Sequence, residues 1–332
     1  MGGNAITNAK RIMKSEYEEL CSFFSEQLTR NNIKFHIIQA YEMKDSFGDM
    51  DILVEKNQIF NLQQVIISLF DFKEVIKNGD VISCNFNDFQ IDFIFESKED
   101  FDFCKGYFSF NDLGNLIGRI AHSLGFKFGH NGVWYCLRDG THLFGEICLT
   151  KDFKTALEFF GFSYERYLQG FTNLTDIFEY VVNSPYFNRD LYPLEHRNHY
   201  ARMRDRKRKT YNEFLKYCDA LPWDIDYIRY GKEIYLQRAM SVFPDFKERY
   251  AVLQNVYIEI QLAKTKFNGE LVREWTGLKG KDLGKFISYM KKDFEELSNQ
   301  WCWTDWVLRN DLDDIRCRTL MLFNFAEWRN HD

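Results

Sequence analysis

The sequence predicts an α+β protein with a small mixed or antiparallel sheet, a second α+β subdomain and an all-helical C-terminal domain. Three observations support this prediction. Helical and strand-like apolar patterns alternate over residues 1–105, an Asn-Gly turn joins short strand-like runs within 106–190, and residues 191–332 follow helical periodicity almost throughout. The chain of 332 residues is long enough for two or three domains, so we place the domains at these three ranges.

The first domain is predicted to hold a sheet backed by two helices. Ser15 is predicted to be the N-cap of the first helix, and Asn87-Asp88 is predicted to be a turn between two antiparallel strands. The short apolar runs have the length and composition of strands, and the longer ones place apolar residues at helical spacing. The predicted helices are 14–30 and 59–71, and the predicted strands are 34–40, 50–55, 80–85 and 89–95.

The rest of the chain is predicted to be mixed and then helical. Asn131-Gly132 is a strong hairpin signal between strands near 126–128 and 133–137, and it lies between helices at 111–124 and 152–160. After Pro193 the spacing of apolar residues predicts one helix after another. These helices are expected near 199–218, 230–242, 245–267, 270–275, 281–299 and 311–328.

Composition narrows the class of protein. Hydrophobic residues make up 45% of the chain and charged residues 28%, which predicts a globular protein with a sizeable core. No apolar run has the length of a membrane span, the N-terminus lacks the pattern of a signal peptide, and the eight cysteines form no C-x-x-C pair. We therefore expect free thiols in a reducing cytoplasm and no contact with a membrane. The net charge of −6 fits a nucleic-acid binder only if cations gather locally.

The segment Ser46-Phe47-Gly48-Asp49-Met50-Asp51 leads into an apolar run that is typical of a buried strand. Because side chains alternate faces along a strand, Asp49 and Asp51 should project from the same side of the sheet. Asp92 lies within the strand-like run 89–95 and supplies a third carboxylate. Three such groups repel one another unless cations lie between them, and hard oxygen ligands suit Mg²⁺, with Mn²⁺ as a substitute. A pair of these ions is what in-line phosphoryl or nucleotidyl transfer requires. The competing interpretation is a Gly-Asp-x-Asp turn that binds no metal.

Gly48-Asp49-Met50-Asp51-Ile52-Leu53 and Ile91-Asp92-Phe93-Ile94 resemble the catalytic palm of the DNA polymerase beta superfamily of nucleotidyltransferases. Downstream, Tyr107-Phe108-Ser109, Asn115, Arg119, Gly145-Glu146 and the region 158–167 follow in an order similar to the thumb-side subdomain of family X polymerases. The resemblance covers roughly residues 33–167, about half of the chain. It implies a nucleotidyltransferase fold with two metal ions on Asp49 and Asp51.

The same resemblance implies roles for single residues. Asp92 would activate the attacking 3′-hydroxyl, and Tyr107 and Phe108 would pack against the sugar of the incoming nucleotide. Asn115 would face the base, and Arg119 the primer–template side. Members of the family usually hold the triphosphate with a Gly-Ser pair at a helix N-terminus shortly before the aspartates. Here that segment is Ile38-Gln39-Ala40-Tyr41, so the triphosphate must be held differently, with Lys44, Ser46 and Gly48 as the nearby candidates.

Two further segments could bind phosphates of a nucleic acid. One is the basic run 197–209, and the other is the glycine-rich segment 271–287, which resembles the tail-domain motif of CCA-adding enzymes and bacterial poly(A) polymerases. Each also has a purely structural interpretation, as a solvated helix face and as a helical hairpin. The tryptophans at 301, 303, 306 and 328 could stack on bases, but core packing is the more frequent role. The candidate nucleic-acid contacts are Arg202, Arg204, Arg206, Lys207, Arg208, Lys209, Lys279 and Lys281.

The function that we expect is addition of a nucleoside monophosphate, from an NTP such as ATP or CTP or from a dNTP, to the 3′ end of a nucleic acid. RNA or tRNA is favoured as the acceptor, because the glycine-rich segment is similar to that of RNA-modifying enzymes. One alternative is a family X-like DNA repair polymerase, although the thirty or so residues before the palm are few for the DNA-binding domain that often precedes it. Another is nucleotidyl transfer to a protein or small molecule, or an inactive scaffold, since fold does not fix function.

Overall fold

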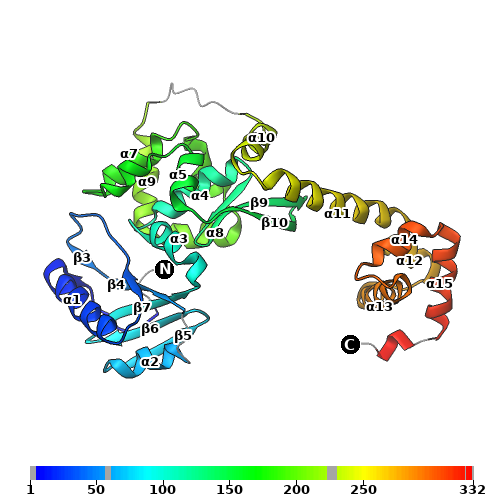
Figure 1. The fold of residues 1–332 in the computed structure, drawn as a ribbon, viewed down its shortest axis with the longest axis horizontal. Coiled ribbons are helices and arrows are strands. Elements are labelled where there is room, and N and C mark those ends of the chain that lie inside the picture. The colour runs from blue at the N-terminus through cyan, green and yellow to red at the C-terminus, as the bar shows by residue number, and fades with distance from the viewer. Residues whose placement is uncertain (1–4, 57–60, 223–229, 326, 331–332) are drawn as a thin grey trace. The chain divides into compact units, whose positions relative to one another are not determined.

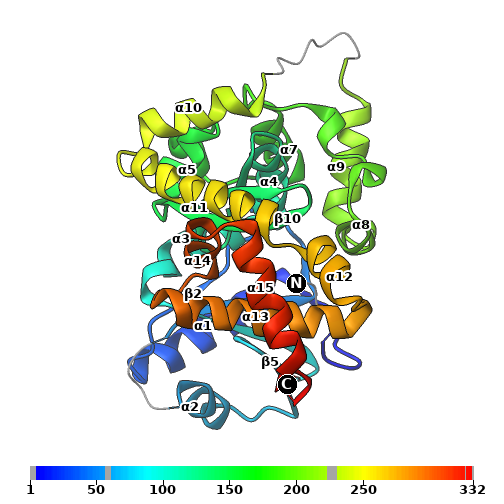
Figure 2. The same cartoon turned by 90° about the vertical axis from the view of Figure 1, so that its right-hand side faces the viewer.

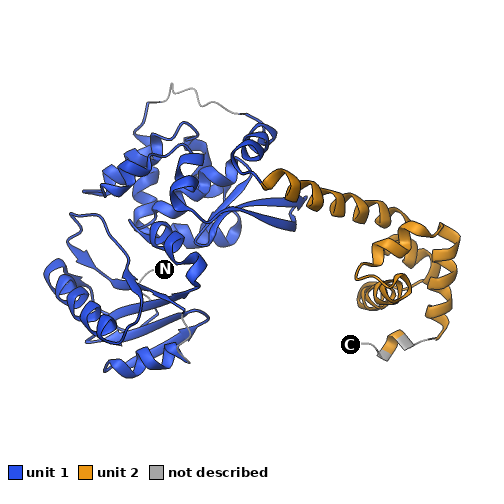
Figure 3. Ribbon diagram, in the orientation of Figure 1, with its two compact units in different colours: residues 1–244 blue, residues 245–332 orange. Residues whose placement is uncertain are grey.

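A computed structural model describes residues 5–56, 61–222, 230–325 and 327–330. The chain divides into two compact units, Met1–Pro244 and Asp245–Asp332 (Figure 3). Each unit has its own core and is described by itself. The first unit combines helices with two sheets of three strands or more, and the second is helical, which confirms the predicted α+β class.

The first unit begins with a five-stranded mixed sheet in the order β2-β4-β7-β6-β5 (Figure 1). β4 and β7 pair in parallel, and the other neighbours are antiparallel. A separate two-stranded ladder joins β1 to β3. The predicted antiparallel pair across Asn87-Asp88 is confirmed as β6 and β7, whereas β5 was missed because its apolar residues are only Val75 and Ile76. The strands are β1 (Ile12–Met13), β2 (Phe35–Ile37), β3 (Ser46–Phe47), β4 (Asp49–Glu55), β5 (Glu74–Asn78), β6 (Val81–Phe86) and β7 (Phe89–Glu96).

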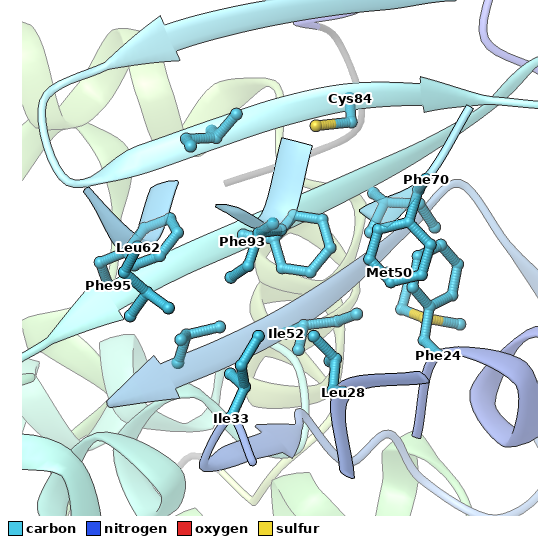
Figure 4. Packing of buried hydrophobic residues seen from close by; sticks show 14 of the residues in the cluster. Phe24, Leu28, Ile33, Met50, Ile52, Leu62, Phe70, Cys84, Phe93 and Phe95 are labelled. Atoms are coloured by element: carbon cyan, nitrogen blue, oxygen red, sulfur yellow. The ribbon is translucent and has the colours of Figure 1, made fainter. Parts of the chain in front are cut away.

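Two helices cover one face of this sheet, as the sequence predicts. They are α1 (Lys14–Arg30) and α2 (Leu62–Leu69); positions 59 and 60 of the second predicted helix lie outside the described residues. Alternate residues of the central strands turn toward these helices, and burial of each such side chain contributes about 1.5–3 kcal/mol. Figure 4 shows this core, which includes Phe24, Leu28, Met50, Ile52, Leu62, Phe70, Phe93 and Phe95.

The opposite face of the sheet is partly covered by α3 (Lys98–Phe108). Leu53 and Ile94 turn to this side and pack with Phe101 and Cys104 of the helix. Because Asp49, Asp51 and Asp92 share the parity of Leu53 and Ile94, the three carboxylates also lie on this face. The sheet therefore separates a hydrophobic core on one side from the acidic residues on the other.

The rest of the first unit adds a three-stranded antiparallel sheet, β8-β9-β10, and several helices. The Asn131-Gly132 hairpin is confirmed, and Gly132 is required there because its φ is +128° and a Cβ would lie 2.7 Å from the Thr150 carbonyl oxygen. The helix predicted at 152–160 is present as α5, which Asp152 caps, whereas β10 was not predicted. The elements are α4 (Leu113–Ser123), β8 (Phe126–Gly129), β9 (Gly132–Asp139), β10 (His142–Thr150), α5 (Phe153–Phe159), α6 (Tyr164–Leu168), α7 (Leu174–Val182), η1 (Arg189–Leu191), η2 (Leu194–His196), α8 (His199–Arg206), α9 (Lys209–Asp219) and α10 (Lys232–Val242).

The division of the chain at 244/245 differs from the boundary that the sequence suggested at 190/191. α8 and α9, which lie side by side (Figure 2), belong to the first unit. The Tyr211 hydroxyl of α9 donates to the Tyr192 carbonyl at 2.6 Å, and the ring of Phe214 lies 4.8 Å from that of Tyr192. Helical periodicity shows that a segment is a helix, but it does not show against which core the helix packs.

The second unit is all-helical, as predicted for this part of the chain. Its core contains Phe286, Met290 and Phe294, together with the tryptophans at 303, 306 and 328, whereas Trp301 is 99% exposed. Gly277 ends α12 with φ +73°, which confirms the structural role of a glycine in this hairpin. The helices are α11 (Phe246–Lys266), α12 (Gly269–Thr276), α13 (Gly280–Ser298), α14 (Trp303–Arg309), α15 (Leu312–Phe325) and η3 (Glu327–Asn330); α14 was not predicted, and position 326 of the last predicted helix lies outside the described residues.

All eight cysteines are free thiols. Among the described helices, none combines the length and the apolar character needed to cross a bilayer.

Candidate active site

The register of the central strands brings the three predicted carboxylates together. β4 and β7 run in parallel with Asp51 directly opposite Asp92, and Asp49 lies two residues before Asp51 on the same face. One carboxylate oxygen from each aspartate lies within 4.8 Å of the other two. The predicted convergence of Asp49, Asp51 and Asp92 on one side of the sheet is therefore confirmed. The alternative interpretation of Gly48–Asp51 as a turn does not apply, because β4 begins at Asp49.

The carboxylates perturb one another because they are close and withdrawn from water. Burial, and then the charges of Asp49 and Asp92, raises the pKa of Asp51 to about 7. Burial also raises the pKa of Asp92, while hydrogen bonds from Ser83 and Gln90 oppose that rise. A neighbouring cation would reverse these shifts, since it favours the charged form of each carboxylate.

The donor set fits a hard divalent cation. Oδ1 of Asp51 is buried and has no hydrogen-bond partner among the described residues. A buried carboxylate oxygen without a donor is costly, and coordination of a metal ion would satisfy it. Carboxylate oxygens are the ligands that Mg²⁺ prefers, and Mn²⁺ accepts the same ligands. The residues Asp49, Asp51 and Asp92 could therefore hold Mg²⁺ or Mn²⁺.

Gln90 fixes the third carboxylate, a role that the sequence analysis missed. Its Nε2 donates to both oxygens of Asp92 at 2.9 Å, and its Oε1 accepts hydrogen bonds from the backbone amides of Ala5 and Ile6 at 3.1 and 3.2 Å. The side chain is 1% exposed, so its amide plane is held from both ends. Gln90 thus orients Asp92 and ties the N-terminal segment to the sheet.

Arg11 is a second residue that the sequence analysis missed. Its guanidinium donates to the Ser46 carbonyl at 2.7 Å and to the Ser46 hydroxyl at 3.1 Å. It also lies against Gly48, where a Cβ would be 2.8 Å from the Nη1 atom of Arg11. Glycine at 48 therefore leaves room for a cation beside the aspartates. No motif indicated this role, because Arg11 precedes the first predicted helix and reaches the site through the pairing of β1 with β3.

Lys44 also lies at the rim of the acidic site. Its ammonium group is 4.5 Å from the centre of the Phe47 ring. Burial lowers the pKa of Lys44, whereas the charges of Asp49 and Asp51 act in the opposite direction. Lys44, Ser46 and Gly48, the predicted phosphate-side candidates, are thus adjacent to the carboxylates.

A cavity of ≈ 820 Å³ is lined by Asp49 and Asp51 but not by Asp92, and all of its lining residues belong to the first unit. This volume lies within the range that encloses small-molecule ligands. Cations from the junction of α8 and α9 line the same cavity as Asp49 and Asp51, although they are more than 150 residues later in the chain. The charged residues of the lining are Arg11, Lys44, Asp45, Asp49, Asp51, Asp112, Arg204, Lys207, Arg208, Lys209 and Glu213, with His130 as a titratable neighbour.

Aromatic residues form another part of the lining. Tyr107 and Phe108 reach the cavity from the end of α3, and the Phe108 ring stacks on His130 with centroids 5.9 Å apart. Asn115 also lines the cavity; its Oδ1 accepts from Arg204 at 3.3 Å, whereas its buried Nδ2 has no partner among the described residues. The cavity therefore offers flat apolar surfaces, an unused amide donor, cations and carboxylates.

Several predicted site residues lie elsewhere. Arg119 is half-buried and donates to the Leu191 carbonyl at 3.0 Å, so it braces the turn after α7 and is not part of the cavity lining. On α8, Arg202 and Arg206 are likewise absent from the lining, unlike Arg204, Lys207, Arg208 and Lys209. Lys279 and Lys281 belong to the second unit, where both are exposed at the start of α13.

Comparison of the sequence with protein-family models gave no match, and comparison with curated proteins gave no significant one.

Proposed function

We propose that this chain is a metal-dependent nucleotidyltransferase that adds a nucleoside monophosphate from an NTP to the 3′-hydroxyl of a nucleic acid, with RNA or tRNA favoured. The observation that carries the proposal is the convergence of Asp49, Asp51 and Asp92, two of which (Asp49 and Asp51) line a cavity that also presents cations and aromatic rings. The resemblance of residues 33–167 to polymerase beta superfamily enzymes supports the same reaction. The sequence order of these residues and their spatial arrangement thus agree with one activity.

The chemistry follows from the three aspartates and from the side chains that line the cavity beside Asp49 and Asp51. Two Mg²⁺ ions, when bound to the aspartates, would stabilise charge on the attacking and leaving oxygens. Asp92 would accept the proton of the attacking 3′-hydroxyl as pyrophosphate leaves the nucleotide. Gln90 holds the Asp92 carboxylate in one orientation while that proton moves. Tyr107 and Phe108 offer apolar faces to a sugar, and Nδ2 of Asn115 offers a donor to a base.

The proposal is tested by incubating the purified chain with Mg²⁺, radiolabelled NTPs and a panel of 3′-hydroxyl acceptors. The panel contains a tRNA transcript, single-stranded RNA and gapped DNA, and label on the protein itself is measured in the same reactions. We expect labelled RNA with the wild-type chain and at least a 1,000-fold loss, on the order expected when an essential catalytic group is removed, in Asp51→Ala.

The matched control is Asp71→Asn, which removes an exposed aspartate outside the cavity and should leave activity unchanged. Label that appears only in gapped DNA would reassign the acceptor to DNA, and label in the protein would reassign it to a polypeptide. Full activity in Asp51→Ala would refute the mechanism.

A further inference from the structure

We propose that the junction of α8 and α9, together with Arg11 and Lys44, forms the subsite for the triphosphate tail of the nucleotide. The inference rests on the proposed function in taking a nucleotide as the ligand. It removes Lys207, Arg208 and Lys209 from the candidate nucleic-acid contacts and assigns them to the nucleotide. It also supplies the phosphate-binding element that the segment 38–41 lacks in sequence.

The first support is the position of cations that have no carboxylate partner. Arg204, Arg208 and Lys209 each have a carboxylate partner, in Asp205, Asp112 and Glu213. In contrast, Lys207, Lys44 and Arg11 have no carboxylate oxygen within 4.0 Å among residues 5–56, 61–222, 230–325 and 327–330. All three line the cavity above the aspartates. Three cations without a carboxylate partner in one cavity favour an anionic ligand there.

The second support is the start of α9. This helix has 11 residues, its N-cap is Arg208, and no side chain caps its first turn. A guanidinium has no acceptor, so the amides of the first turn cannot be satisfied by the N-cap residue. Lys209 and Thr210 of that turn line the cavity. Backbone amides at a helix N-terminus favour a bound phosphate, and the lysines on either side of Arg208 add charge.

The third support is the balance of charge inside the cavity. A triphosphate carries about four negative charges, and it must approach three carboxylates, so cations are needed on the side away from the aspartates. The α8–α9 junction supplies them from a different part of the chain. Two residues that line this cavity each hold a buried atom without a hydrogen-bond partner among the described residues, namely Oδ1 of Asp51 and Nδ2 of Asn115. The Asp51 oxygen can bind a cation, and the Asn115 amide can donate to an acceptor. A nucleotide with its bound metal ion supplies both partners.

A nucleotide tail accounts for these observations better than the backbone of a nucleic acid does. Arg11, Lys44 and Lys207 share one cavity with Asp49 and Asp51, so a ligand that reaches these cations also reaches the metal-binding carboxylates, as the tail of a nucleotide must. On α8, the exposed Arg206 and the half-buried Arg202 lie outside the cavity.

The test measures binding of Mg²⁺-tripolyphosphate, and of an NTP against its NMP, by isothermal titration calorimetry with the full chain. We expect Lys207→Ala to weaken tripolyphosphate and NTP binding roughly 10- to 100-fold, the range for loss of a charged hydrogen bond, and to leave NMP binding unchanged. The matched control is Lys216→Ala, which removes an exposed lysine farther along α9 and outside the cavity. It should bind both ligands as the wild type does.

A second variant separates a binding defect from a folding defect. Thr210→Asp places a carboxylate in the first turn of α9, which favours the helix but repels a phosphate. We expect an unchanged or higher Tm with loss of tripolyphosphate binding. Retention of wild-type tripolyphosphate affinity in both variants, with weaker and less salt-dependent binding of RNA, would overturn the inference and assign the junction to the acceptor backbone.

The two proposals fail in different ways. If Lys207→Ala and Thr210→Asp lose tripolyphosphate binding but the wild-type chain labels no acceptor, the subsite stands and the proposed transfer reaction is wrong. If the wild-type chain transfers label normally and the two variants keep the wild-type KM for NTP, the reaction stands and the subsite is wrong.

Discussion

Replacement of Asp51 by asparagine should make the metal-free protein more stable at high pH. Asp51 is opposite Asp92 and beside Asp49, and burial together with these charges raises its pKa to about 7. In the unfolded chain its pKa is that of an ordinary aspartate, about 3.9. Between these two values the folded state binds the extra proton, so stability falls as pH rises through this window. Asparagine has nearly the same shape and carries no charge, and it therefore removes the penalty.

The size of the effect follows from the shift. The penalty from Asp51 is on the order of 4 kcal/mol at pH 8 and about 1 kcal/mol at pH 4.5, at 1.36 kcal/mol per pKa unit. Asp51→Asn should thus stabilise the metal-free chain by up to that amount at pH 8 and by much less at pH 4.5. Saturating Mg²⁺ should stabilise the wild type at pH 8 and have little effect on Asp51→Asn, because a bound cation offsets the same repulsion.

The assay is urea unfolding of the wild type, Asp51→Asn and the exposed control Asp71→Asn, at both pH values, with EDTA or with Mg²⁺. The control should behave as the wild type does. An equal or lower unfolding midpoint for Asp51→Asn at pH 8 in EDTA would refute the account of the carboxylate cluster. Equal stabilisation of both proteins by Mg²⁺ would refute the assignment of Asp51 as a ligand.

Three further predictions concern other parts of the molecule. Gln90→Ala should lower kcat about 10- to 100-fold with little change in the KM for NTP, because Asp92 loses two hydrogen bonds. Steady-state kinetics would measure both constants, and an unchanged kcat would show that Gln90 does not position Asp92. Asp205→Asn should destabilise the first unit by about 3–5 kcal/mol, because it leaves the buried guanidinium of Arg197, 2.7 Å away, without its counter-charge. Urea unfolding measures this loss. A loss under about 1 kcal/mol, which is the contribution of an exposed ion pair, would contradict the prediction. Deletion of 245–332 should leave residues 1–244 folded and able to bind Mg²⁺-tripolyphosphate, because each unit has its own core. Thermal unfolding followed by circular dichroism would test the fold, and calorimetry would test the binding. Loss of cooperative unfolding in the shortened chain would show that the units depend on each other.

The carboxylate site could be predicted from the sequence because it depends on local pattern. Alternation along a strand places Asp49 and Asp51 on one face, and the apolar run around Asp92 identifies a neighbouring strand. The helices and strands around them are equally local, since each results from periodicity and a capping or turn residue. What could not be predicted is the parallel pairing of β4 with β7, which sets Asp51 directly opposite Asp92.

The residues that the sequence analysis missed or misplaced act over long distances in the chain. Gln90 is an ordinary polar residue in a strand until the fold brings residues 5 and 6 against it. Arg11 reaches Ser46 only through a two-stranded ladder, and the guanidinium of Arg119 is directed to the Leu191 carbonyl by packing around Tyr192. The basic run was visible as a cluster, but its approach to the aspartates depends on how α8 and α9 pack within the first unit.

The central claim is that Asp49, Asp51 and Asp92 together bind divalent cations for nucleotidyl transfer. Its most direct test is electron paramagnetic resonance of Mn²⁺ with the wild type, Asp51→Asn, Asp92→Asn and Asp71→Asn, each with a non-hydrolysable NTP analogue. We expect up to two bound Mn²⁺ ions per chain in the wild type and in Asp71→Asn, and weaker or lost binding in the other two variants. Equal Mn²⁺ binding in all four proteins, or none in the wild type, would contradict the account.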